Sequence, residues 1–184
     1  MNAPTGLLID PLAGAHAEAV EGVNAWRGRC LASFASVEVR ITEVLMTLAA
    51  TREDVALGQL FGQRVAALEK LVAEDPSARA VTDTLAAFLV HEPLRAFLAH
   101  GDAKVTIDRS GRWQVVLTAI TLKRRQAHSS FVVIDETEAR AIAQALGRDR
   151  LRLINSLARW CPGTAGQGST GHERIALRIG GAAA

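Results

Sequence analysis

The sequence contains little cysteine and few aromatic residues. Cys30 and Cys161 are too few for a disulfide framework, so we expect a reducing compartment. Tyrosine is absent and aromatic residues make up only 4% of the chain, which disfavours a stacking platform for single-stranded bases. No stretch approaches the roughly 18 uninterrupted apolar residues of a membrane span, and no signal peptide is visible at the start. We therefore expect a cytoplasmic protein that has no membrane partner.

The familiar motifs of metal and cofactor chemistry are also missing. No cysteines and histidines have the spacing of zinc ligands, and no glycine-rich phosphate loop or Gly-x-Ser-x-Gly elbow is present. We expect no metal site and no cofactor.

Charge is distributed unevenly along the chain. Residues 1–100 carry 8 Lys and Arg against 12 Asp and Glu, whereas residues 101–160 carry 11 against 6. The basic second half indicates a polyanionic partner or self-association, unless these charges are simply a solvated surface.

The chain length of 184 residues fits one domain. Residues 1–15 are small and rich in proline and glycine, which predicts a mobile lead. Residues 16–160 form the predicted domain, and residues 161–184 are a Gly/Ala-rich segment that we expect to be a flexible tail.

Apolar residues at spacings of three and four predict a long helix from about Glu18 to Ala50. Glu38 lies inside this apolar stripe, although carboxylates are seldom buried without a partner. Its side chain therefore either reaches water at the edge of the stripe or pairs with a basic group. Thr51 is a candidate cap for a second helix over residues 51–75, and Ser77 for a third.

The apolar period changes to two after residue 102, which predicts an antiparallel three-stranded meander over residues 103–134. Asp135 and Glu138 have the spacing of a capping box and open a last helical region up to Trp160. Gly147 is a point at which this region could divide into two helices. The predicted fold is therefore α+β and mainly α: a helical bundle with a small meander before the last helical region.

The segment around Arg95 and His100 is the strongest candidate for chemistry. Pro93 predicts either a kink or a new helix start near Glu92, and Gly101 predicts a left-handed glycine stop. Five positions on a continuous helix turn a side chain by about 140°, so the two side chains meet only if the chain turns at Gly101. A guanidinium beside an imidazole is the pair that metal-free phosphodiester cleavage uses.

The run Leu94-Arg95-Ala96-Phe97-Leu98-Ala99-His100-Gly101 resembles the Arg-x4-6-His signature of the HEPN superfamily (higher eukaryotes and prokaryotes nucleotide-binding). The resemblance implies a helical-bundle homodimer in which the Arg and His of both protomers face one cleft. Catalytic members are metal-independent endoribonucleases, often toxins or anti-phage effectors, whereas other members bind RNA, nucleotides or proteins without catalysis. Ala96 departs from the usual polar residue after the Arg, and the meander is not part of the minimal bundle.

The resemblance implies that Arg95 stabilises the phosphate and that His100 is the acid/base. The residues that could support this pair are Glu38, His91 and Asp102, and those that could contact an RNA backbone are Lys123, Arg124 and Arg125. The partners it implies are a second copy, RNA, and a cognate antitoxin or regulatory protein.

The alternative interpretation of the same residues is structural. Arg95 then neutralises Glu38 or Glu92, and His100 binds the carbonyls at the helix C-terminus. The basic residues 123–125 are then a solvated turn, and His91 is a solvated helix residue. The chain would be a non-catalytic HEPN-like RNA- or protein-binding module, or an unrelated helical regulatory protein.

Overall fold

The computed structural model describes residues 11–123 and 126–161, and it confirms an α+β fold that is mainly α. The elements in chain order are α1 (Pro11–Ala49), α2 (Phe61–Ala73), a short 3-10 helix (Pro76–Ala78), α3 (Arg79–Leu89), α4 (Glu92–His100), β1 (Asp102–Ile107), β2 (Trp113–Lys123), β3 (Gln126–Asp135) and α5 (Glu136–Trp160). Residues 1–10 of the predicted lead lie outside the described residues. So does the predicted tail from residue 162 onward.

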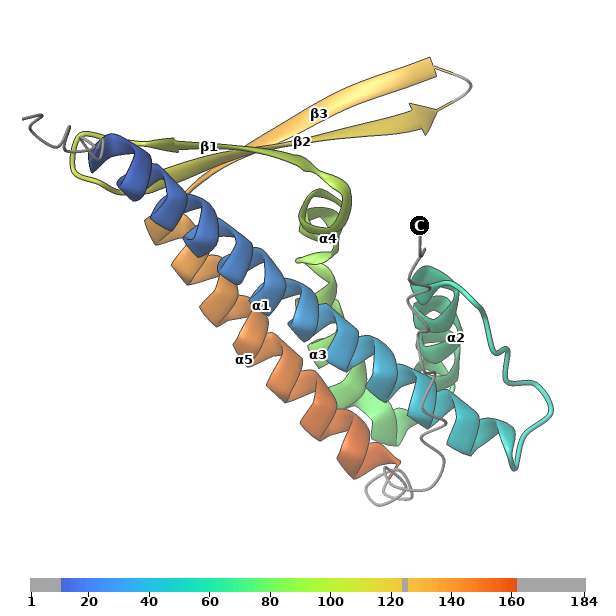
Figure 1. Ribbon diagram of the computed structural model, residues 1–184. Coiled ribbons are helices and arrows are strands. Elements are labelled where there is room, and N and C mark those ends of the chain that lie inside the picture. Colours follow the sequence, from blue (N-terminus) through green and yellow to red (C-terminus); the bar gives the residue numbers. More distant parts are fainter. Residues whose placement is uncertain (1–10, 124–125, 162–184) are drawn as a thin grey trace, which may run out of the picture.

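The two longest helices, α1 and α5, lie side by side and run in the same direction, with α3 packed against both (Figure 1). The apolar stripe predicted for α1 is buried in this contact, where the Phe34 ring meets the Phe88 ring of α3 edge to face at a centroid distance of 5.5 Å. Burial raises the pKa of the Cys30 thiol in the same stripe to about 11. Along 11–123 and 126–161, no helix has both the length and the apolar character that crossing a bilayer requires.

The helix boundaries differ from the prediction at two places near α1. The helix begins at Pro11, well before Glu18, because proline fits the first turn of a helix. The predicted helix start at Thr51 is wrong: its hydroxyl donates back to the carbonyl of Leu48, so it closes α1, and α2 begins only at Phe61.

The later boundaries follow the sequence signals more closely. Asp75 rather than Ser77 caps the 3-10 helix, since its carboxylate accepts the Ser77 amide at 2.8 Å. The capping box at Asp135 and Glu138 is confirmed, and α5 continues through Gly147 without a break.

The meander is confirmed, and the pairing of β3 with β2 runs from Gln126 to Asp135. The strand order is β1-β2-β3, and the register is continuous in both antiparallel pairs. Alternation along the strands gives the sheet two faces. The inner face packs on the helices through buried residues that include Val115, Leu117 and Ile134. Beyond β1, the paired ends of β2 and β3 form a two-stranded ribbon that stands clear of the helices (Figure 1).

Candidate functional site

The Arg95/His100 segment forms α4, a helix held in place by its apolar residues. Leu98 is fully buried, and Leu94 and Phe97 pack partly buried against the core. Of the two alternatives at Pro93, the structure has a new start, since α4 begins at Glu92 with proline in its first turn.

Arg95 is held by an ion-pair cluster with α1 and α2. Its guanidinium lies 3.4 Å from Glu38 Oε2 and stacks over the Phe61 ring, 4.9 Å from the centroid. Arg64 of α2 donates to the other carboxylate oxygen of Glu38. One carboxylate therefore holds two arginines, so of the two alternatives for Glu38 the structure shows the pairing with basic groups.

Arg64 is the member of this cluster that the sequence analysis missed. It lies three residues after Phe61 and four before Leu68, both of which are buried, so its position beside the apolar stripe of α2 was a usable signal. Its side chain is only 17% exposed, against 34% for Arg95.

His100 is the exposed last residue of α4, and no hydrogen bond or ion pair joins it to Arg95, although the structure describes both residues. The helix is unbroken between them, which directs the two side chains about 140° apart. The structure therefore does not bring the predicted pair together within one chain.

The end of α4 also differs from the prediction at Gly101. A left-handed stop is wrong, since Gly101 has φ −70° and ψ 132°. Glycine is needed for another reason: a Cβ at this position would lie 2.4 Å from the carbonyl oxygen of Phe97. Arg27 of α1, rather than His100, binds the free carbonyls, donating to Leu98 O at 2.8 Å and to Gly101 O at 3.1 Å.

The other predicted support residues lie apart from Arg95. His91 is half-buried rather than solvated, because its Nε2 lies 2.9 Å from Asp149 of α5 and its ring packs edge to face on Phe88. Asp102 is exposed at the start of β1, opposite Thr118.

Of the predicted RNA-contacting residues, Lys123 is the one whose backbone the structure describes. Lys123 is the last residue of β2 and pairs with Gln126. Arg124 and Arg125 lie outside the described residues.

A shallow hollow of 350 Å³ adjoins the arginine cluster on α1 and α2. Both Glu38 and Glu43 line it, together with Arg64. Both carboxylates are paired with arginines, Glu38 with Arg64 and Arg95 and Glu43 with Arg40. An anion such as an RNA phosphate would therefore have to compete with Glu38 for Arg64.

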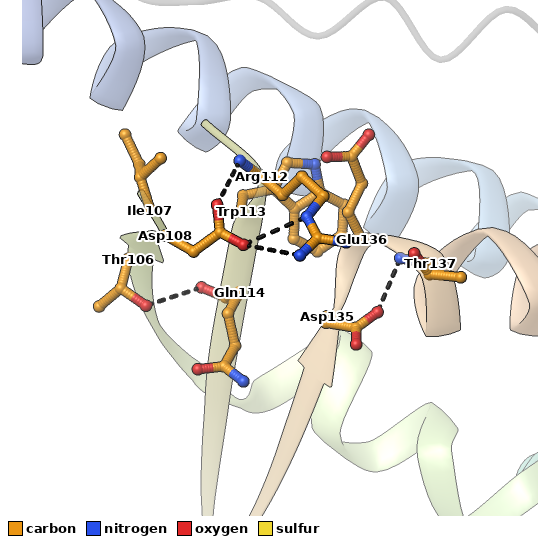
Figure 2. Close-up of a pocket in the computed structure, with 9 residues that line it drawn as sticks. All are labelled: Thr106, Ile107, Asp108, Arg112, Trp113, Gln114, Asp135, Glu136 and Thr137. Carbon is orange, nitrogen blue, oxygen red and sulfur yellow. Dashed lines mark hydrogen bonds and ion pairs between the residues drawn. The ribbon is translucent and has the colours of Figure 1, made fainter. Parts of the chain in front are cut away.

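A second hollow of 270 Å³ lies at the end of the sheet, where the β1–β2 turn meets the start of α5 (Figure 2). Asp108 accepts the Ser110 hydroxyl and the Arg112 amide there, and the Arg112 guanidinium pairs with the same carboxylate. These bonds lower the pKa of Asp108 to about 2, and the hydrogen bond from the Ser110 hydroxyl has the largest effect. All of them lie within one turn, so the carboxylate fixes the hairpin. Among the described residues, no group of three or more His, Cys, Asp or Glu could hold a metal ion.

We expect Ser110→Ala to raise the pKa of Asp108 toward its ordinary value of 3.8, because the strongest bond to the carboxylate is lost. In the native protein the folded-state pKa is lower than the unfolded one, so the ionised carboxylate stabilises the turn above about pH 4 and this contribution is lost as the pH falls to about 2. An NMR titration of the carboxyl carbon measures the shift. Arg109→Ala, a neighbouring substitution in the same turn, should leave this pKa unchanged, and a native Asp108 that titrates near 3.8 would contradict the assignment.

No family model, no curated protein and no solved structure matches this chain.

Proposed function

We propose that this protein is a non-catalytic HEPN-like module that acts by binding protein rather than by cleaving RNA. The observation that carries the proposal is the engagement of Arg95 by Glu38 and Phe61 while His100 lies exposed at the end of the same unbroken helix. Metal-free cleavage needs the guanidinium and the imidazole on one phosphate. An RNA phosphate at Arg95 would have to displace Glu38, which also holds Arg64.

The outer face of the sheet supports protein as the partner class. The β2–β3 register and the alternation of side chains place Ile120, Leu122, Phe131 and Val133 on one face, opposite the face that packs on the helices. All four are exposed, and they lie close enough to form one apolar patch. On this face β2 and β3 carry no Lys or Arg. Lys104 of β1 lies on the same face, opposite Val116 at the border of the patch, so the patch itself suits an apolar protein surface rather than a phosphate backbone.

The test is RNA cleavage in EDTA with the full chain and with His100→Ala. We expect neither protein to release fragments from single-stranded or hairpin RNA. A metal-independent ribonuclease is the positive control and should cleave both RNAs in the same buffer. Cleavage by the native chain that disappears in His100→Ala, with an unchanged circular dichroism spectrum, would overturn the proposal. In that case the HEPN-like endoribonuclease with Arg95 and His100 in their predicted roles would replace it.

A further inference from the structure

The outer edge of β3 has no strand beside it in the described part of the chain, because the order is β1-β2-β3. We propose that β3 pairs antiparallel with β3 of a second copy, so that two three-stranded sheets become one six-stranded sheet. This inference rests on the proposed function and deepens it, since it names the partner as the protein itself.

The edge lacks the features that keep exposed strands apart. Natural edge strands carry lysine, proline or a bulge, or are very short. β3 has ten residues, Gln126–Asp135, and contains no lysine, arginine, glutamate or proline. Its pairing with β2 is one to one along the whole strand, so no bulge twists it away. A strand of this length, about 33 Å, can pair along its outer edge with another strand through its backbone N–H and C=O groups.

The apolar patch on the outer face of the sheet reaches this edge. Phe131 lies on the outer face of β3 and is 71% exposed, and Ile120 on β2 is 73% exposed. A two-fold axis perpendicular to the sheet keeps the outer faces of both copies on the same side. Edge pairing therefore joins the two patches across the axis and shields the Phe131 rings from water.

The acidic end of β3 decides the direction of pairing. Asp135, Glu136 and Glu138 stand at the end of the strand, whereas it starts with the uncharged Gln126 and Ala127. Antiparallel pairing places the uncharged start of one strand beside the acidic end of the other. Parallel pairing would place the two acidic ends side by side.

The two faces restrict the register. Residues directly opposite in an antiparallel pair lie on the same face, and a one-residue slip would exchange the faces. The odd-numbered residues of β3 lie on the outer face, so a symmetric pair must centre on one residue rather than between two. We place the axis at Phe131, the one aromatic residue of the strand, so that Phe131 meets Phe131 of the second copy and Ser129 meets Val133.

The first test measures association of the full chain by sedimentation equilibrium. We expect a dimer whose dissociation constant rises at least about tenfold in Phe131→Lys, because two ammonium groups meet at the axis and the ring is lost. Ile120→Lys removes a side chain of similar exposure from the same face but away from the edge, and it should change the constant less than about threefold. A monomeric native chain, or equal effects of the two substitutions, would overturn edge pairing.

The second test fixes the register by cross-linking with diamide. Phe131→Cys should give a disulfide-linked dimer, because directly opposite residues lie within the Cα distance of a disulfide. Ile120→Cys should not, because its two copies lie three strand spacings apart, about 14 Å, and are offset by a further distance of about 13 Å along the strands. Cys30 and Cys161 are both buried and should not contribute. Stronger cross-linking of Ser130→Cys than of Phe131→Cys would contradict the register.

The two proposals fail by different measurements. RNA cleavage that depends on His100 overturns the proposed function whatever the oligomeric state. A native chain that stays monomeric overturns the β3 pairing even when no RNA is cleaved.

Discussion

Replacement of Glu38 by alanine is expected to lower the free energy of unfolding by about 2 kcal/mol, because two arginines lose the carboxylate that they share. Arg64 is mostly buried and keeps no other ion pair among the described residues. The cluster is partly open to water, with Glu38 30% exposed, so the cost stays below that of a fully buried pair. Urea unfolding followed by circular dichroism measures the change.

The matched control is Glu21→Ala. Glu21 is an exposed carboxylate on the same helix and forms no ion pair with any residue that the structure describes, so its loss should change stability by less than about 0.5 kcal/mol. Double-mutant cycles of Glu38 with each arginine then separate the two interactions. We expect the coupling energy to be larger with Arg64 than with Arg95, because Arg64 is the more buried of the two.

The outcome also bears on the proposed function. If Glu38→Ala leaves stability unchanged, the carboxylate does not hold Arg95, and the guanidinium is available to a ligand. The main argument against the nuclease would then be lost.

The sequence was sufficient for those parts of the fold that depend on local periodicity. The apolar stripe of α1, the change to a period of two after Asp102, and the capping box at Asp135 correspond to elements of the structure. Glu38 could be singled out for the same reason, since a carboxylate inside an apolar stripe requires either water or a cation.

The parts that local pattern could not give depend on tertiary contacts. Thr51 has the chemistry of an N-cap, but its hydroxyl bonds backward to Leu48 and ends a helix. The sequence motif also could not show which way Arg95 points, because its partners Glu38 and Phe61 come from two other helices. The free edge of β3 follows from the strand order, which a list of strands does not contain.

Gly101→Ala is the second substitution with a large expected effect, a loss of about 2 kcal/mol in the free energy of unfolding. The backbone of Gly101 is in a region that alanine adopts freely, so the cost arises from the clash of the new Cβ with the carbonyl oxygen of Phe97. Relief requires the end of α4 to move, which also disturbs the bonds from Arg27 to Leu98 and Gly101.

Two further variants distinguish the clash with Phe97 from a left-handed backbone as the reason for glycine at position 101. Gly147 lies inside α5 with open space where a Cβ would stand, so Gly147→Ala should stabilise the protein by about 0.5–1 kcal/mol in urea unfolding, the measurement used for all of these variants. Asparagine tolerates a left-handed backbone better than alanine does. Gly101→Asn should nevertheless be no more stable than Gly101→Ala, because both carry the Cβ that meets Phe97. An asparagine variant close to native stability would show that the backbone conformation, and not the close approach, requires glycine at the end of α4.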